Sequence, residues 1–208
     1  NVKTYDLKRH CIENSLYGVD IDAGAVEICK LRFWLSMIVD EEDFYNIKPL
    51  PNLDYKVVCG NSLLGFPEDW ESEISERIER LFDEYFSETN PTRKEQLKDE
   101  IDRNIRRRLE GSEQNFGYKI EFDFRLFFPK VFHQEHQKYG FDVVLANPPY
   151  VRQERIKDQK PFLQRSGYEV YNSTSDIYTY FYEKGCQVLK PNGVLCFISS
   201  NKWMRAKY

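Results

Sequence analysis

The residues best placed to do chemistry are Asn147, Pro148, Pro149 and Tyr150, which directly follow an apolar run over 141–146. The run predicts a strand buried on both faces, and open parallel sheets bind ligands beyond the carboxyl ends of their strands. Prolines have no main-chain N–H, so the pair leaves only carbonyl oxygens as main-chain polar groups. With the Asn147 side-chain oxygen and the flat ring of Tyr150, these acceptors suit a planar group that carries an NH2.

Such an amine is a poor nucleophile because its lone pair is delocalised, and two acceptors on its two hydrogens would localise that pair toward an electrophile. A purely structural role is the alternative. Two prolines after a strand make a rigid turn, and Asn147 would then cap it.

Short β-rich runs alternate with amphipathic helical runs along the chain, which is typical of an α/β sheet. The pattern predicts strands over 16–21, 55–59, 141–146 and 194–198, helices over 23–39 and 176–189, and a turn over 191–193.

Residues 68–111 interrupt this alternation with two helical runs separated by Asn90-Pro91. Residues 68–90 carry nine acidic and two basic residues, and residues 91–111 carry five acidic and seven basic ones. Opposite charge predicts an antiparallel helical hairpin inserted into the sheet domain. Arg106, Arg107 and Arg108 could touch phosphates, but such a run is more often a solvated helix face.

Cysteine and histidine usage gives no sign of a metal centre or a disulfide framework. The chain has five cysteines, far apart and without a C-x-x-C pair: Cys11, Cys29, Cys59, Cys186 and Cys196. Four of the five lie in apolar runs, where a free thiol behaves as a small buried hydrophobe. His133 and His136 have no third ligand nearby, and a zinc site needs at least three. We therefore expect reduced core thiols and no metal.

The tetrapeptide at 147–150 resembles the catalytic motif of amino-methyltransferases that use S-adenosylmethionine, above all the DNA adenine-N6 methyltransferases. The run 17–26 is similar to their second cofactor motif, and 59–63 to their third. The spans 122–132 and 198–206 resemble the large bacterial enzymes that combine restriction and modification, together with their phage-defence relatives. The resemblance implies a Rossmann-like methyltransferase sheet.

The resemblance also assigns cofactor contacts. It implies that Asp20 takes the ribose hydroxyls, that Ile21 packs on the cofactor adenine, and that Asn61, followed by Ser62 and Leu63, faces the adenine amine. The family commonly has aspartate where Asn61 stands, so this contact would be an uncharged one. Helix capping is the alternative role for Asp20, although Asp22 stands nearer the helix start.

For the target, the resemblance implies that Asn147 and the Pro148 carbonyl hold the adenine amine while Tyr150 stacks on the base. Double-stranded DNA is then the partner, with the adenine flipped out of the helix. Residues 151–165 carry five basic and two acidic residues. We expect DNA contacts from this stretch and the C-terminal end, chiefly Arg152, Arg155, Lys157 and Lys202, with Lys160 and Arg165 as further cations. An ordinary exposed loop is the alternative.

No G-x-G occurs among the ten glycines, so the family's glycine-rich first motif is missing. We expect an excerpt, inactive alone, that lacks the first strand and a target-recognition domain, with a catalytic domain at 1–67 and 112–208 and an insertion at 68–111. No apolar run approaches the roughly 20 residues that span a bilayer, and the resemblance points to the cytoplasm of a bacterium or archaeon. A protein-glutamine N5 methyltransferase and a non-catalytic fragment of a larger DNA-modifying machine are the alternatives.

Overall fold

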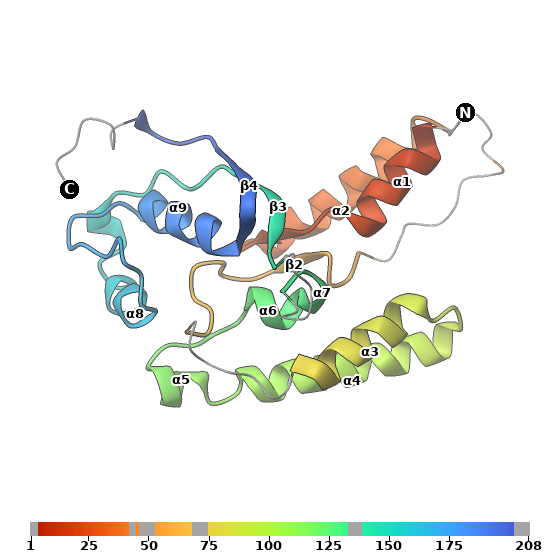
Figure 1. Ribbon diagram of the computed structural model, residues 1–208, viewed down its shortest axis with the longest axis horizontal. Helices are drawn as coiled ribbons and strands as arrows, with labels where there is room; N and C mark the ends of the chain where they lie inside the picture. Colours follow the sequence, from red (N-terminus) through yellow and green to blue (C-terminus); the bar gives the residue numbers. More distant parts are fainter. Residues whose placement is uncertain (1–3, 42–44, 46–52, 68–74, 133–138, 202–208) are drawn as a thin grey trace. The chain divides into compact units, whose positions relative to one another are not determined.

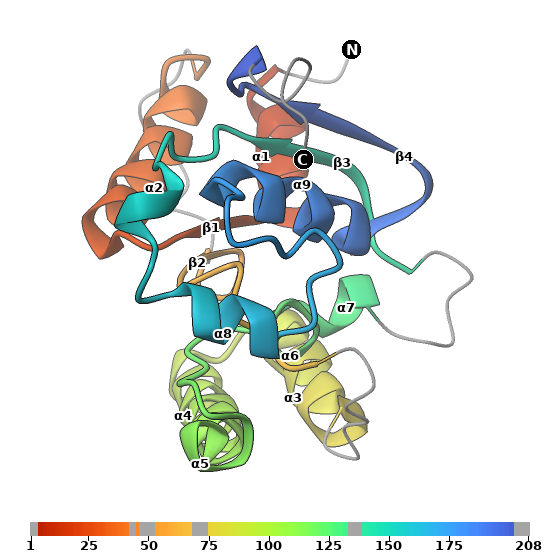
Figure 2. The same ribbon diagram turned by 90° about the vertical axis from the view of Figure 1, so that its left-hand side faces the viewer.

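The computed structural model describes residues 4–41, 45, 53–67, 75–132 and 139–201. The chain divides into two compact units, Asn1–Ser62 and Leu63–Tyr208, which are described separately below. Figures 1 and 2 show the elements in two views. None of the helices in the described ranges combines the length and apolar character needed to cross a membrane.

The first unit is a two-stranded parallel sheet with two helices. Its elements are α1 (Thr4–Asn14), β1 (Gly18–Asp20), α2 (Ala23–Ile38) and β2 (Val57–Cys59). Strand β1 pairs with β2 so that their carboxyl ends lie side by side. Helix α2 begins where the sequence predicts, because Asp22 accepts a hydrogen bond from the Ala25 amide at 2.8 Å and caps the helix. The core of this unit consists of Tyr5, Ile12, Met37 and Leu53, flanked by Phe33 and Trp34.

The second unit contains the predicted helical pair. Helices α3 (Ser75–Ser87) and α4 (Pro91–Leu109) lie side by side in Figure 1, and α4 starts at the Asn90 cap, which accepts from the Arg93 amide at 3.1 Å. Ion pairs join Arg77 near the start of α3 to Glu100 in the middle of α4 at 3.0 Å, and Glu84 near the end of α3 to Arg93 near the start of α4 at 3.8 Å. The two helices are therefore antiparallel, with charge complementarity along their contact.

A cluster of aromatic rings follows the helical pair. It includes the short helices α6 (Phe124–Phe127) and α7 (Pro129–Phe132) and the first residue of β3 (Phe141–Ala146). The helix α5 (Ser112–Phe116) lies before them in sequence. The rings meet mostly edge to face at centroid distances near 5–6 Å, a favourable geometry for aromatic pairs: Phe122, Phe124, Phe128, Phe132 and Phe141.

The second sheet consists of β3 and β4 (Leu189–Phe197), which are parallel and joined through α9 (Ile177–Val188). Helix α9 packs closely on one face of β4, as Figure 2 shows. A Cβ added at Gly185 would lie 2.7 Å from the Leu195 side chain and 2.8 Å from the Phe197 ring. Glycine at this helix position therefore permits the close approach.

The turn predicted over 191–193 is wrong, because this segment is an irregular part of β4. Phe141 pairs with Leu189 and Val143 with Val194, so β4 has a bulge opposite β3. Asn192 has a φ of 66°, in the left-handed region that asparagine tolerates better than most residues. Turn-forming residues here bend a strand instead of ending it.

Two burial predictions are also wrong within the described residues. The apolar strand at 141–146 exposes half of Val143 and 71 % of Leu145, and Ile198 beyond β4 is 69 % exposed. Alternation explains this pattern: Leu195 and Phe197 face α9, while their neighbours point to the opposite face. All five thiols are free, as predicted, but four are exposed and Cys29 is half-buried, because they lie on outward positions of their elements.

The α/β class is confirmed, as two small parallel sheets with helices. The compact units divide between Ser62 and Leu63, and the helical pair belongs to the second of them. A single Rossmann-like sheet, its missing first strand and the division at 68–111 stay predictions.

Candidate active site

The tetrapeptide lies where the strand pattern places it. Asn147 directly follows the last residue of β3, and the adjacent end of β4 is fastened by a hydrogen bond from the Ile198 amide to the Ala146 carbonyl at 3.0 Å. Because β3 and β4 are parallel, their carboxyl ends form one edge. Residues 147–150 and 198–201 therefore extend from neighbouring strand ends.

Two hydrogen bonds through Val151 fix the backbone after the tetrapeptide. The Val151 amide donates to the Pro149 carbonyl at 2.9 Å, and the Val151 carbonyl accepts from the Ile177 amide at the start of α9 at 3.4 Å. Pro148 is buried, whereas Asn147 and Pro149 are exposed. Within the described part of the chain, neither the Asn147 side chain nor the Pro148 carbonyl has a hydrogen-bond partner. Within the described residues neither acceptor is therefore occupied, and the Asn147 side chain is the exposed one of the two.

Tyr150 presents its ring to the outside while its hydroxyl is held. The residue is 59 % exposed, and its hydroxyl donates to the Ile198 carbonyl at 3.3 Å. The sequence argument used only the ring and missed Ile198. A main-chain carbonyl leaves no signal in residue type, so only the pairing of β3 with β4 could have suggested this contact.

The first unit brings together the predicted cofactor residues on β1 and after β2. Asp20 and Cys59 are paired at the carboxyl ends of the two strands, and the Gly60 amide donates to the Asp20 carbonyl at 2.9 Å. This geometry places residues 20–21 beside the chain that continues into Asn61 and Ser62. Both of the latter are half-buried.

Asp20 and Ile21 have the exposure that a ligand contact requires. One Asp20 carboxylate oxygen, Oδ1, accepts from the Asp22 amide at 2.8 Å, and within the described residues the other has no hydrogen-bond partner. Ile21 directly follows β1 and is 72 % exposed. The capping role belongs to Asp22, as the sequence indicated, so Asp20 is not the cap of α2.

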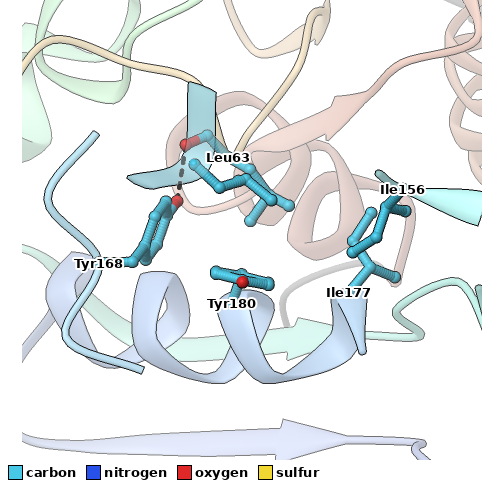
Figure 3. Packing of buried hydrophobic residues seen from close by; sticks show 6 residues of the cluster. Leu63, Ile156, Tyr168, Ile177 and Tyr180 are labelled. Carbon is cyan, nitrogen blue, oxygen red and sulfur yellow. Dashed lines mark hydrogen bonds between the residues drawn. The ribbon is translucent and has the colours of Figure 1, made fainter. Parts of the chain in front are cut away.

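Leu63 differs from its two predecessors because its side chain is buried in the second unit. It packs with residues from the segment after the tetrapeptide and from α9: Ile156, Leu163, Tyr168, Ile177 and Tyr180 (Figure 3). The cofactor contact predicted for Leu63 would therefore be made by its main-chain atoms alone.

The basic stretch after the tetrapeptide divides into exposed and buried cations. It forms a 3-10 turn (Gln153–Arg155) and α8 (Lys160–Arg165). The predicted DNA contacts Arg152, Arg155 and Lys157 are exposed, and Lys202 lies outside the described residues.

Lys160 is not an exposed phosphate ligand. It is buried, its ammonium donates to the Ser173 carbonyl, and burial lowers its pKa, since desolvation outweighs the nearby Asp176 charge. Arg165 stays exposed but donates to the Gly117 carbonyl at 2.9 Å.

Among the described residues, no group of three or more His, Cys, Asp or Glu side chains could hold a metal ion, and His133 and His136 lie outside them. The chain is thus an α/β protein, and its candidate site residues lie at the carboxyl ends of parallel strands, where ligands bind in open parallel sheets.

Comparison with known sequences names the family. The chain belongs to the Eco57I restriction-modification methylase family, whose model matches residues 14–208. This match confirms the predicted relationship to restriction–modification methyltransferases.

Curated relatives agree with this family. Over 69 residues, 31 % of the chain, it is 49 % identical to the putative type II restriction enzyme and methyltransferase RM.MjaORFECS2P of Methanocaldococcus jannaschii. Over 70 residues, 34 % of the chain, it is 41 % identical to the type II methyltransferase M.XhoI of Xanthomonas vasicola. Over 97 % of the chain it is 23 % identical to the type II restriction enzyme and methyltransferase RM.Eco57I of Escherichia coli. These alignments cover 6 %, 13 % and 15 % of the respective relatives, and no solved structure matches the chain.

Proposed function

We propose that the full-length protein transfers a methyl group from S-adenosylmethionine to the N6 amine of adenine in DNA, as the modification part of a restriction–modification or phage-defence system. Family membership supports the DNA methyltransferase class. The observation that carries the adenine assignment is the exposed Asn147 side chain, which has no hydrogen-bond partner among the described residues, on the same turn as the exposed ring of Tyr150.

In this proposal, Asn147 and the Pro148 carbonyl each accept one hydrogen of the adenine amine. The amine becomes a nucleophile only when its nitrogen turns pyramidal and its lone pair leaves the ring system. Acceptors fixed on a proline turn favour that geometry, and their contribution is greatest in the transition state. Proline at both positions after Asn147 limits backbone rotation, so the acceptors need little reorganisation.

Tyr150 would hold the flipped base by stacking. An adenine inside a duplex is unreachable, so it must rotate out of the helix at a cost of a few kcal/mol. Base–aromatic stacking typically returns about 1–3 kcal/mol per base. Arg152, Arg155 and Lys157 follow this site in sequence and are exposed, which suits contacts to the DNA backbone.

The residues of the first unit fit the proposed methyl donor. An exposed carboxylate at the end of β1 suits ribose hydroxyls, and the exposed Ile21 side chain suits the face of an adenine ring. Asn61 follows the end of the neighbouring strand, where an amide oxygen can accept from an adenine amine. The donor would supply a methyl group on a sulfonium with a neutral leaving group, so the chain needs no metal and no covalent intermediate.

The test is incubation of the full-length protein with methyl-labelled S-adenosylmethionine and unmethylated DNA, followed by nucleoside digestion and chromatography. We expect label in N6-methyladenine, its loss in Asn147→Ala, and its retention in Asn115→Ala, which alters an exposed asparagine of α5. Label in a glutamine-containing protein substrate instead of DNA would establish the protein-glutamine alternative. Cofactor binding without any transfer to DNA would leave only a non-catalytic role.

A further inference from the structure

Side chains from distant parts of the second unit hold the main chain of Leu63–Pro67. Five hydrogen bonds reach this segment of five residues, and their side-chain partners lie 53 to 105 positions later in the sequence: Tyr118, Asp123, Arg125 and Tyr168. The segment belongs to no helix or strand. Its conformation is therefore fixed by side chains instead of by a regular main-chain ladder.

Two tyrosines bind carbonyls of the segment. The Tyr168 hydroxyl donates to the Leu63 carbonyl at 2.6 Å, shown as the dashed line in Figure 3, and the Tyr118 hydroxyl donates to the Gly65 carbonyl at 2.9 Å. Both rings are buried. Burial raises the pKa of Tyr168 and of Tyr118 above the ordinary tyrosine value, so both hydroxyls stay protonated and remain donors.

An aspartate and an arginine clamp the rest of the segment. The buried Asp123 carboxylate accepts from the Phe66 amide at 3.0 Å, while the Arg125 guanidinium donates to the carbonyls of Phe66 at 3.1 Å and Pro67 at 3.0 Å. A Cβ at Gly65 would lie 2.8 Å from an Asp123 oxygen. A side chain at position 65 would therefore displace the carboxylate that binds the Phe66 amide.

This segment continues directly from Asn61 and Ser62, the residues proposed to face the cofactor adenine. We propose that Tyr168 is a positioning residue that fixes the main chain adjoining Asn61–Ser62 and thereby sets the affinity for the cofactor. Asp123, Arg125 and Tyr118 hold the same segment. The inference rests on the proposed function, because it assigns its effect to that cofactor contact.

Tyr168 also connects this segment to the chain that follows the tetrapeptide. Its cluster includes Ile156 and Leu163 from that chain and Ile177 and Tyr180 from α9. Displacement of Tyr168 would therefore loosen the anchoring of residues 151–168 as well as that of Leu63.

Tyr168→Phe in the full-length protein removes the hydrogen bond and keeps the ring. The matched control is Tyr180→Phe, because Tyr180 is fully buried in the same cluster with its ring centroid 5.4 Å from that of Tyr168. Within the described residues, the Tyr180 hydroxyl makes no hydrogen bond of normal geometry, although the Asn172 backbone faces it.

We expect Tyr168→Phe to raise the dissociation constant and KM for S-adenosylmethionine about threefold to tenfold, the effect of one lost hydrogen bond. The turnover rate at saturating cofactor and the KM for DNA should stay within about twofold, because the ring and the target site are unchanged. Amide hydrogen exchange over 61–67 should accelerate without cofactor. Tyr180→Phe should change none of these quantities.

The outcomes separate this inference from the proposed function. Wild-type protein that binds S-adenosylmethionine, with Tyr168→Phe equal to it in affinity, would overturn the positioning role alone. Faster exchange with unchanged affinity would show that the network holds the segment but does not serve the cofactor, which also overturns the inference. Wild-type protein without affinity for S-adenosylmethionine would overturn both.

Discussion

Tyr150 allows the ring and the hydroxyl of one side chain to be tested separately. Tyr150→Ala removes both the exposed ring and the hydroxyl, whereas Tyr150→Phe removes only the hydroxyl that donates to the Ile198 carbonyl. Sequence reasoning alone predicts that Tyr150→Phe retains most activity, because it uses only the ring. Because the hydroxyl donates to the Ile198 carbonyl, we expect it to contribute as well, by orienting the ring.

The two effects differ in expected size. The hydrogen bond is long, at 3.3 Å, and the residue is 59 % exposed, so water can replace the lost partner. We assign it the lower part of the usual range, about 0.5–1 kcal/mol, or roughly a twofold to fivefold loss of base capture. Loss of the ring should cost about 1–3 kcal/mol, or roughly fivefold to 150-fold.

The methylated sequence is first mapped on DNA treated with wild-type protein. The assay then compares the affinities of the wild type and of each variant for two duplexes that contain this sequence. One carries the target adenine opposite an abasic site, so that base extrusion breaks no base pair, and the other lacks the target base. The ratio of the two affinities measures base capture free of backbone contacts. Single-turnover methylation of the first duplex then measures transfer.

We expect base capture to decrease from the wild type through Tyr150→Phe to Tyr150→Ala, with the Tyr150→Phe value near that of the wild type. A Tyr150→Ala ratio equal to that of the wild type would refute stacking on this ring. A Phe variant as defective as the Ala variant would show that the Ile198 contact, and not ring area, controls capture.

Three further predictions follow from the described contacts. Asp20→Ala should weaken S-adenosylmethionine binding about tenfold to a hundredfold, because a charge-assisted hydrogen bond is lost, and should leave DNA affinity unchanged. Titration calorimetry checks both affinities, and an unchanged cofactor affinity would show that Asp20 is not part of the site. Asn147→Ala should lower the single-turnover rate far more than DNA affinity, and equal losses in both would argue for a role in folding. Asp123→Ala leaves the Phe66 amide and two helix amides of α6 without their acceptor, so we expect about 1–3 kcal/mol of destabilisation. Denaturant-dependent hydrogen exchange should show earlier unfolding of this region, and protection equal to the wild type would contradict the clamp.

Local chemistry made much of the fold predictable. The bounds of β3 and the start of α2 follow from an apolar run and from the Asp22 cap, and each signal lies within a few residues of its effect. Asn90 placed the start of α4 for the same reason. Pairing between strands that are distant in the sequence leaves no such local signal. The sequence could not reveal that Pro191-Asn-Gly193 lies in a bulge after which β4 pairs with β3 again, because those residues suit a turn equally well.

The candidate site divides in the same way. The position of Asn147 at a strand end was predictable, because it depends only on where β3 stops. The support of Tyr150 by Ile198 and of Leu63 by Tyr168 was not, since the partners lie 48 and 105 residues apart and each acceptor is a main-chain carbonyl. Residue types that are common in any core, such as tyrosine, give no indication of which carbonyl they will meet.

The bulge in β4 has a consequence for how this family can vary. One residue separates the paired positions on β3, but four separate Leu189 from Val194 on β4. Side chains alternate along a strand, so gaining or losing one residue in that interval would turn Leu195 and Phe197 away from α9. It would also rotate the Ile198 carbonyl away from the Tyr150 hydroxyl. Related sequences should therefore tolerate substitution at these four positions more readily than insertion or deletion, because the residue count sets the parity of everything downstream.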